Sequence, residues 1–193
     1  YHWALVFGGT MDDGRSADYP PVDLGLWGKW RGLPAPYPLV CHLLDTGAAV
    51  EVLWRDVLPA SVQGSVARGL GVSVPEAGRL VAFWAALHDI GKIIPGFQLQ
   101  VDGASALLQG YSDAGGRVFY RHDLASQLFL QRVLTELGYA PGLVGGASAA
   151  RVAQILGGHH GCFHAVELGH GDPRAVVPEL GDAGWERQRR AAL

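Results

Sequence analysis

Six side chains that can bind metal ions are the strongest indication of chemistry in this sequence. Imidazole nitrogens combined with a carboxylate suit divalent transition metals such as iron, manganese, nickel, cobalt and zinc. Six ligands are more than one tetrahedral site needs, so two ions and metal-assisted hydrolysis are indicated. Chance scatter is disfavoured because a His-Asp pair and a His doublet both fall at expected helix ends. The six residues are His42, His88, Asp89, His122, His159 and His160.

Helices with apolar faces must bring these ligands together, because the ligands are spread over about 120 positions. Apolar residues recur at helical spacing around each ligand. The helix before the His88-Asp89 pair is apolar almost all round, so burying that pair would be costly without a compensating cation. We expect helices over about 38–54, 75–89, 122–137 and 147–156 and one more beyond 173, a Gly-rich connection at 64–71, and a surface loop at 100–118.

Length and composition indicate one ordinary globular domain. The chain has 193 residues, of which 49% are hydrophobic and 17% charged, and no alternating strand pattern is sustained. The expected fold is therefore all-α, a helical bundle with metal ligands converging from several helices. No stretch has the length of a membrane span and no signal peptide is recognised, so we expect a cytoplasmic protein without a membrane partner.

The charge distribution limits how the chain could bind nucleic acid. Its formal net charge is −3, so affinity for a polyanion would have to come from a local groove or from another domain. The basic clusters at 29–31 and 187–190 are interpreted as solvated faces. Residues 11–37 are interpreted as an irregular arm anchored by Trp27, Trp30 and Tyr37, with stacking of these aromatics on bases as the alternative.

Three strings in the sequence can be compared as a set. They are Leu26-Trp27-Gly28-Lys29 leading to 37–46, His88-Asp89-Ile90-Gly91-Lys92 followed by Pro95-Gly96-Phe97-Gln98, and Gly157-Gly158-His159-His160-Gly161. In combination they are similar to the HD superfamily of metal-dependent phosphohydrolases. Within it, they most resemble the HD nuclease domain of the CRISPR-associated nuclease-helicase of type I systems, with the I-E branch as the best fit. The resemblance spans about residues 25–165.

The resemblance implies a division of labour among the ligands. Asp89 would bridge two divalent transition-metal ions, with iron, manganese, nickel or cobalt expected. His42 and His88 would serve one ion, and the remaining three histidines the other. The family cuts single-stranded DNA, delivered by an attached helicase domain after recruitment to the RNA-guided CRISPR surveillance complex (Cascade).

One departure from the family concerns its last ligand. The pattern ends with a further aspartate some tens of residues beyond the doublet, and Asp172 and Asp182 are too close to it. We therefore expect the chain to stop short of that residue, leaving one metal site incomplete. Residues 1–24 are expected to be an N-terminal extension, in part extra sequence or the product of trimming. Residues 25–193 are expected to be a C-terminally truncated HD nuclease domain without its helicase.

Four further residues receive candidate roles. Lys92 is expected to act at the catalytic site, by reaching a phosphate beside the metals or by supporting the site electrostatically. Asp45 lies one turn from His42 and is expected to orient an imidazole. Phe97 and Gln98 are candidates for lining a substrate groove, with a packing role at a helix start as the alternative.

Two other functions remain open. The first is a different HD phosphohydrolase, acting on a nucleotide or a cyclic dinucleotide. The HD-GYP enzymes carry an acidic residue and a Gly-Tyr-Pro segment after their doublet, whereas Gly161-Cys162-Phe163-His164 follows it here, which disfavours them. The second is a truncated, inactive HD domain that docks on a partner.

Overall fold

The computed structural model describes residues 21–101, 103–104, 108, 110–111, 119–140, 148–163 and 178–193. Within these ranges the chain is mostly helical with little sheet, which confirms the predicted all-α bundle. The elements are β1 (Trp27–Lys29), β2 (Tyr37–Pro38), α1 (Leu39–Val52), the π-helical turn η2 (Leu53–Val57), α2 (Ala60–Leu70), α3 (Val74–Ala86), the 3-10 turn η3 (Ile90–Lys92), α4 (Pro95–Gln98), α5 (His122–Glu136), α6 (Ala149–Gly157), the 3-10 turn η5 (Pro178–Leu180) and α7 (Ala183–Ala191).

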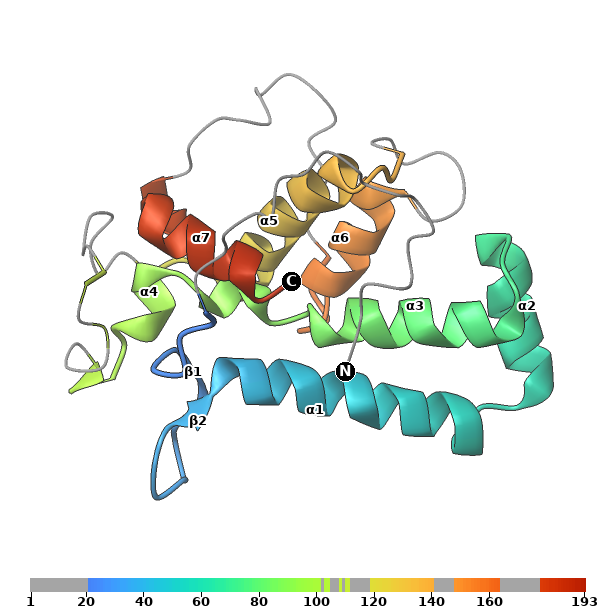
Figure 1. Ribbon diagram of the computed structural model, residues 1–193, viewed down its shortest axis with the longest axis horizontal. Helices are drawn as coiled ribbons and strands as arrows, with labels where there is room; N and C mark the ends of the chain where they lie inside the picture. Colours follow the sequence, from blue (N-terminus) through green and yellow to red (C-terminus); the bar gives the residue numbers. More distant parts are fainter. Residues whose placement is uncertain are drawn as a thin grey trace.

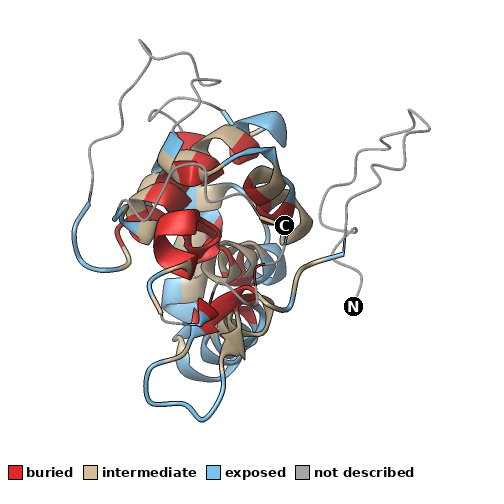
Figure 2. Cartoon of the chain, turned by 90° about the vertical axis from the view of Figure 1, so that its left-hand side faces the viewer, coloured by how far each residue is buried: buried red, intermediate tan, exposed pale blue. Residues whose placement is uncertain are grey.

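The helices form two packed pairs that meet around one interior. Helices α1 and α3 lie side by side in opposite directions and are joined through α2 (Figure 1). Helices α5 and α6 form the second pair, and η3 packs against α5. The buried residues gather where the helices face each other (Figure 2). The largest apolar cluster includes Ile90 and Ile93 after α3, Phe129 and Leu130 of α5, and Trp185 of α7.

Local sequence signals explain where α3 begins. The Ser73 side chain accepts a hydrogen bond from Glu76 N, and the Glu76 carboxylate accepts one from Ser73 N, which is a capping box. Pro75 lies in the first turn, where its missing N–H costs nothing. These signals place the helix start where the sequence predicts it.

The predicted Gly-rich connection at 64–71 is wrong, because most of it forms α2. Gly64 and Gly69 are helical, and a Cβ on Gly69 would meet no atom within 4 Å. Ala67 is buried with Trp54 and Ala77, so apolar packing outweighs the low helix propensity of glycine. The helix ends at Leu70, where the following residue has a φ of 71°.

Two other expectations differ from the structure. The helix expected over 75–89 ends at Ala86, so the His88-Asp89 pair lies in the turn between α3 and η3. The arm expected to be irregular contains a short antiparallel hairpin, in which Trp27 is opposite Pro38 and Lys29 is opposite Tyr37. The expectations for residues 1–20, for Asp172 and for most of the 100–118 loop lie outside the described residues.

No single described helix is long and apolar enough to cross a bilayer. The bent pair formed by Ala60–Leu70 and Val74–Lys92 passes on length and composition only when its two parts, 81° apart, are joined.

Candidate metal centre

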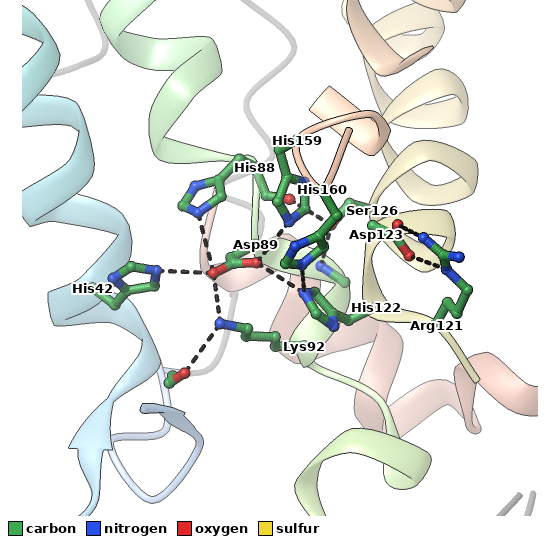
Figure 3. A network of polar contacts seen from close by, with 12 residues as sticks. His42, His88, Asp89, Lys92, Arg121, His122, Asp123, Ser126, His159 and His160 are labelled. Atoms are coloured by element: carbon green, nitrogen blue, oxygen red, sulfur yellow. Dashed lines mark hydrogen bonds and ion pairs between the residues drawn. The ribbon is translucent and has the colours of Figure 1, made fainter. Parts of the chain in front are cut away.

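The six predicted ligands come from four separate elements and converge on one point. His42 projects from α1, and His88 and Asp89 from the turn after α3. His122 is the first residue of α5, and the doublet His159-His160 lies in the turn after α6. Figure 3 shows the five imidazoles surrounding the Asp89 carboxylate.

Asp89 is the centre of the cluster. Asp89 is buried, with only 3% of its surface exposed. Its Oδ2 atom lies 2.8 Å from His42 Nε2 and 3.1 Å from His88 Nε2. Its Oδ1 atom lies 3.4 Å from His122 Nε2 and 3.3 Å from His159 Nε2. Each carboxylate oxygen therefore faces a different pair of imidazoles.

The potential ligand atoms fall into two groups that share this centre. Atoms of His42, His88 and Asp89 lie within 4.8 Å of one another, and so do atoms of the three remaining histidines. In the second group His160 Nε2 lies 2.9 Å from His122 Nε2. Nitrogen-rich sets of three with a carboxylate between them match the donor preference of divalent transition metals.

The proton positions of two histidines give an independent test of this fit. His88 Nδ1 lies 2.9 Å from the Ala85 carbonyl oxygen, and His159 Nδ1 lies 2.6 Å from that of Leu156. A carbonyl oxygen only accepts, so each Nδ1 carries a proton, and in the neutral form of the ring the lone pair is then on Nε2, the atom that faces Asp89. A nitrogen lone pair that faces a carboxylate oxygen is repelled by it unless a cation or a proton lies between the two atoms.

Two buried atoms at the centre lack a hydrogen bond within the described residues. They are Asp89 Oδ1 and His159 Nε2. A buried acceptor without a partner costs about 1–3 kcal/mol, so the arrangement suits a bound cation. The donor chemistry and these two atoms together make the residues a good fit for the divalent ions that the sequence predicts.

The charges of the site follow from burial and from the surrounding imidazoles. Burial raises the pKa of the Asp89 carboxyl, but the imidazoles of His122, His159, His42 and His88 around it outweigh burial and hold the pKa well below its usual range. Burial lowers the pKa of His159, but the Asp89 carboxylate facing its ring reverses this to a net rise. The pKa of His160 is lowered by burial and by the neighbouring His159 and His122.

Close approach of the backbone positions both halves of the cluster. A Cβ on Gly91 would lie 2.1 Å from the His122 carbonyl oxygen, so only glycine lets this turn touch α5. Ser126 locks the contact, since its hydroxyl donates to His88 O at 2.7 Å and accepts from Gly91 N at 2.9 Å. At the end of α6, a Cβ on Gly157 would lie 3.1 Å from the Asp123 carbonyl oxygen of α5. The absence of a side chain at Gly157 therefore lets the turn that carries His159 and His160 lie close to α5.

Sequence reasoning missed the role of Ser126. Its spacing of four residues from His122 places it on the same helix face, but a serine at that spacing is common on any buried helix. The ion pair between Arg121 and the buried Asp123, drawn in Figure 3, was also not anticipated. Asp123 Oδ1 also accepts a hydrogen bond from Leu124 N at the start of α5.

Lys92 contacts the centre directly. Its ammonium donates to Asp89 Oδ2 at 2.6 Å and to the Gly28 carbonyl oxygen at 3.1 Å, and the residue is 9% exposed. This position agrees with electrostatic support of the site. Phe97 packs edge-on against His122 with ring centroids 5.2 Å apart.

Two other candidates have different surroundings from those expected. Asp45 accepts a hydrogen bond from the Tyr37 hydroxyl, and no described contact joins its carboxylate to an imidazole. The assignment as an orienting group for His42 is therefore not retained. Gln98 is fully buried and hydrogen-bonds Trp27 N, Trp27 O and Lys92 O, so it cannot line a groove. Gln98 is the last residue of α4, and its hydrogen bonds join that helix to Trp27 of β1.

Asp182 caps a helix. Its carboxylate accepts a hydrogen bond from Gly184 N at 2.8 Å at the start of α7.

Comparison with known proteins gives a family match over most of the chain. The family model described as "Cas3, HD domain" matches residues 27–193. A curated relative, the CRISPR-associated nuclease/helicase Cas3 of Streptococcus thermophilus, is 31% identical over 139 residues, which cover 64% of this chain and 14% of that protein. The chain therefore spans only a small part of that relative's length.

Solved structures agree with the family match. A crystal structure of T. fusca Cas3 with AMPPNP has a TM-score of 0.77 and 39% identity, covering 90% of this chain and 19% of that one. A chain of a CRISPR RNA-guided surveillance complex, pre-nicking, has a TM-score of 0.75 and 38% identity, covering 90% and 20%. The Thermus thermophilus Cas3 HD domain in the presence of Ni²⁺ has a TM-score of 0.60 and 28% identity, covering 89% and 62%.

Proposed function

The chain belongs to the Cas3 HD-domain family, and from this membership we propose that it is a nuclease domain that hydrolyses phosphodiester bonds of single-stranded DNA. The observation that carries the proposal is the buried Asp89 carboxylate, whose two oxygens face two separate groups of imidazoles. This arrangement supports two divalent ions side by side.

The proposed ligand sets are those that the cluster itself suggests. His42 and His88 would hold one ion with Asp89 Oδ2, and the other three histidines would hold the second with Asp89 Oδ1. Such ions polarise a phosphodiester, lower the pKa of a bound water and offset the charge that develops on the phosphate.

The chain's own residues prepare the site for this chemistry. The carbonyls of Ala85 and Leu156 fix the ring orientation of His88 and His159, so that Nε2 already points inward and less conformational freedom is lost on binding. The lowered pKa of Asp89 keeps its carboxylate ionised. Lys92 holds a positive charge beside that carboxylate, where it can also attract a phosphate.

We also propose the cellular setting that the family suggests. The domain would act in the cytoplasm beside a helicase domain of the same protein and with an RNA-guided surveillance complex. Support comes from the similarity to the T. fusca protein, of which this chain covers 19%, and to the chain of the surveillance complex.

The proposal is tested by measuring metal content and cleavage on the same samples. Asp89→Asn should lower bound manganese or nickel, measured by elemental analysis, and abolish cleavage of linear single-stranded DNA. Asp56→Asn is the matched control, because Asp56 is an exposed residue of η2 paired only with Arg55 in the described contacts. It should retain both properties.

Three results would count against this function. Hydrolysis of a cyclic dinucleotide without cleavage of DNA would favour the alternative phosphohydrolase. Absence of bound transition metal in the wild-type chain after incubation with manganese would favour a docking domain. Equal metal content in wild type and Asp89→Asn would remove the carboxylate from the centre.

A further inference from the structure

An open groove lies between the β1–β2 hairpin and the segment around α4. Its volume is about 360 Å³, at the lower end of the range for small-molecule sites. The metal ligands are not among its lining residues. The groove is lined by Trp27, Lys29, Trp30, Arg31, Leu33, Phe97, Gln100 and Val101.

Aromatic rings form the wall of this groove. Trp30 meets Trp27 edge-on with ring centroids 5.8 Å apart, and Trp27 packs against Phe97 at 4.5 Å. Trp27 and Phe97 are almost fully buried, whereas Trp30 is half-buried and packs on the edge of their cluster. Trp30 is therefore the ring with the most surface left to contact a ligand.

The wall is held in place by the buried side chain of Gln98. Trp27 Nε1 donates to the main-chain carbonyl oxygen of Gln98 at 3.0 Å. The side-chain amide of Gln98 accepts a hydrogen bond from Trp27 N through Oε1 and donates one to Trp27 O through Nε2. With its indole N–H already satisfied, Trp27 offers only apolar surface. A wall fixed in this way loses little conformational entropy when it binds a flat ring.

The rim of the groove carries positive charge. Lys29 and Arg31 are exposed and lie on either side of Trp30 in the sequence, and no acidic residue is among the lining residues. The whole chain has a formal charge of −3, so this local excess of cations differs in sign from the average surface. A flat apolar ligand with flanking negative charges would be complementary to it.

The Phe97 side chain lies between the groove and the metal centre. Phe97 lines the groove and also packs against His122. The Lys92 ammonium lies 5.3 Å from the centroid of the same ring and bonds both Asp89 and the backbone of β1. A strand held in the groove could therefore reach the centre by passing Phe97.

We propose that this groove binds one unpaired nucleotide of the substrate strand, with the base stacked on Trp30 and the adjacent phosphates held by Lys29 and Arg31. The inference rests on the proposed nuclease function and adds to it a binding site outside the metal centre. Stacking on an aromatic ring with cations beside it is the chemistry that recognises single strands without regard to sequence.

The test measures binding without cleavage. Anisotropy of a fluorescein-labelled oligothymidylate is recorded in EDTA, so that no metal-dependent hydrolysis occurs. Trp30→Ala should weaken binding about 5- to 150-fold, the range for loss of one stacked base. Trp30→Phe keeps a smaller aromatic ring on which a base can stack and should recover most of the affinity. A nonspecific loss of affinity on replacing Trp30 would not be restored in this way.

The cationic part of the proposal is tested by salt dependence. Lys29→Ala/Arg31→Ala should reduce the slope of log affinity against log salt by about 1.4, from two lost phosphate contacts at about 0.7 each. Arg55→Ala/Arg68→Ala is the matched control: it removes the same charge from exposed positions in η2 and α2, at the other end of α1 (Figure 1). The control should keep the wild-type slope.

The outcomes separate this inference from the proposed function. If wild type cleaves DNA but the Trp30 and Lys29/Arg31 variants bind the strand as tightly as wild type, the groove assignment is overturned and the nuclease stands. An equal loss of slope in the Arg55/Arg68 control would also overturn it, because the cations would then act only through net charge. If wild type binds the strand through the groove but never cleaves it with manganese or nickel, the nuclease function fails.

Discussion

Gly91→Ala should be strongly destabilising, because the position faces backbone atoms that cannot rotate away. The new Cβ would lie 2.1 Å from His122 O and 2.3 Å from Ser126 N. Helix α5 would have to move from the turn, which also breaks the hydrogen bond from Gly91 N to the Ser126 hydroxyl. His122, as the first residue of α5, would move with it.

The size of the effect follows from these two losses. Overpacking of a well-packed interior costs about 1–3 kcal/mol. Loss of one buried hydrogen bond adds about 0.5–1.5 kcal/mol. The free energy of unfolding should therefore fall by about 2–4 kcal/mol, which corresponds to a Tm lower by roughly 5–15 °C for a chain of this length.

The measurement is urea unfolding followed by circular dichroism, in EDTA so that metal binding does not contribute. Gly69→Ala is the matched control, because it makes the same change in α2 where a Cβ meets nothing within 4 Å. It should raise stability by about 0.5–1 kcal/mol. If Gly91→Ala unfolds within about 0.5 kcal/mol of wild type, the contact between the turn and α5 does not require glycine.

Two more predictions concern charged side chains. Lys92→Ala should slow cleavage of single-stranded DNA, while the metal content measured by elemental analysis is retained. The reason is that Lys92 pairs with the Asp89 carboxylate but is not one of the proposed metal ligands. An equal loss of cleavage and of metal content would make Lys92 part of the metal-binding structure. Glu186→Gln should make the free energy of unfolding less dependent on pH in the acid range. Burial alone raises the pKa of Glu186, but the neighbouring arginines Arg189 and Arg132 lower it overall. A carboxyl whose pKa is lowered by folding stabilises the fold above its unfolded value of about 4.3 and loses that contribution as the pH falls. Urea titrations from pH 7 to pH 3.5 should therefore show a shallower loss in the variant, and parallel curves would contradict this reasoning.

The arrangement of the ligands was largely predictable from the sequence. Helical periodicity placed the adjacent pair and the doublet at or near the ends of expected helices, and the strings around them resemble one family. The grouping of His122 with the doublet came from that resemblance, and the structure places these three side chains together. Periodicity alone could not have paired them, because it says nothing about which helix ends converge.

The differences arise where tertiary contacts outweigh local signals. Gly64 and Gly69 predicted a connection, but packing of the intervening Ala67 stabilises a helix there. Strands of two and three residues are too short to show alternation, so the hairpin had no sequence signature. Asp45 and His42 share a helix face, yet Tyr37 of the hairpin provides the partner of Asp45.

The origin of the ligands in four separate elements ties metal occupancy to the integrity of the whole fold. Ions that bind only the native chain stabilise it by mass action, by about 2.7 kcal/mol per site at a free concentration one hundred times the dissociation constant. Detachment of α1 alone would remove His42 and open one ligand set while leaving the other histidines in place. If the domain binds metal as proposed, its Tm would therefore rise and fall with the concentration of free transition metal.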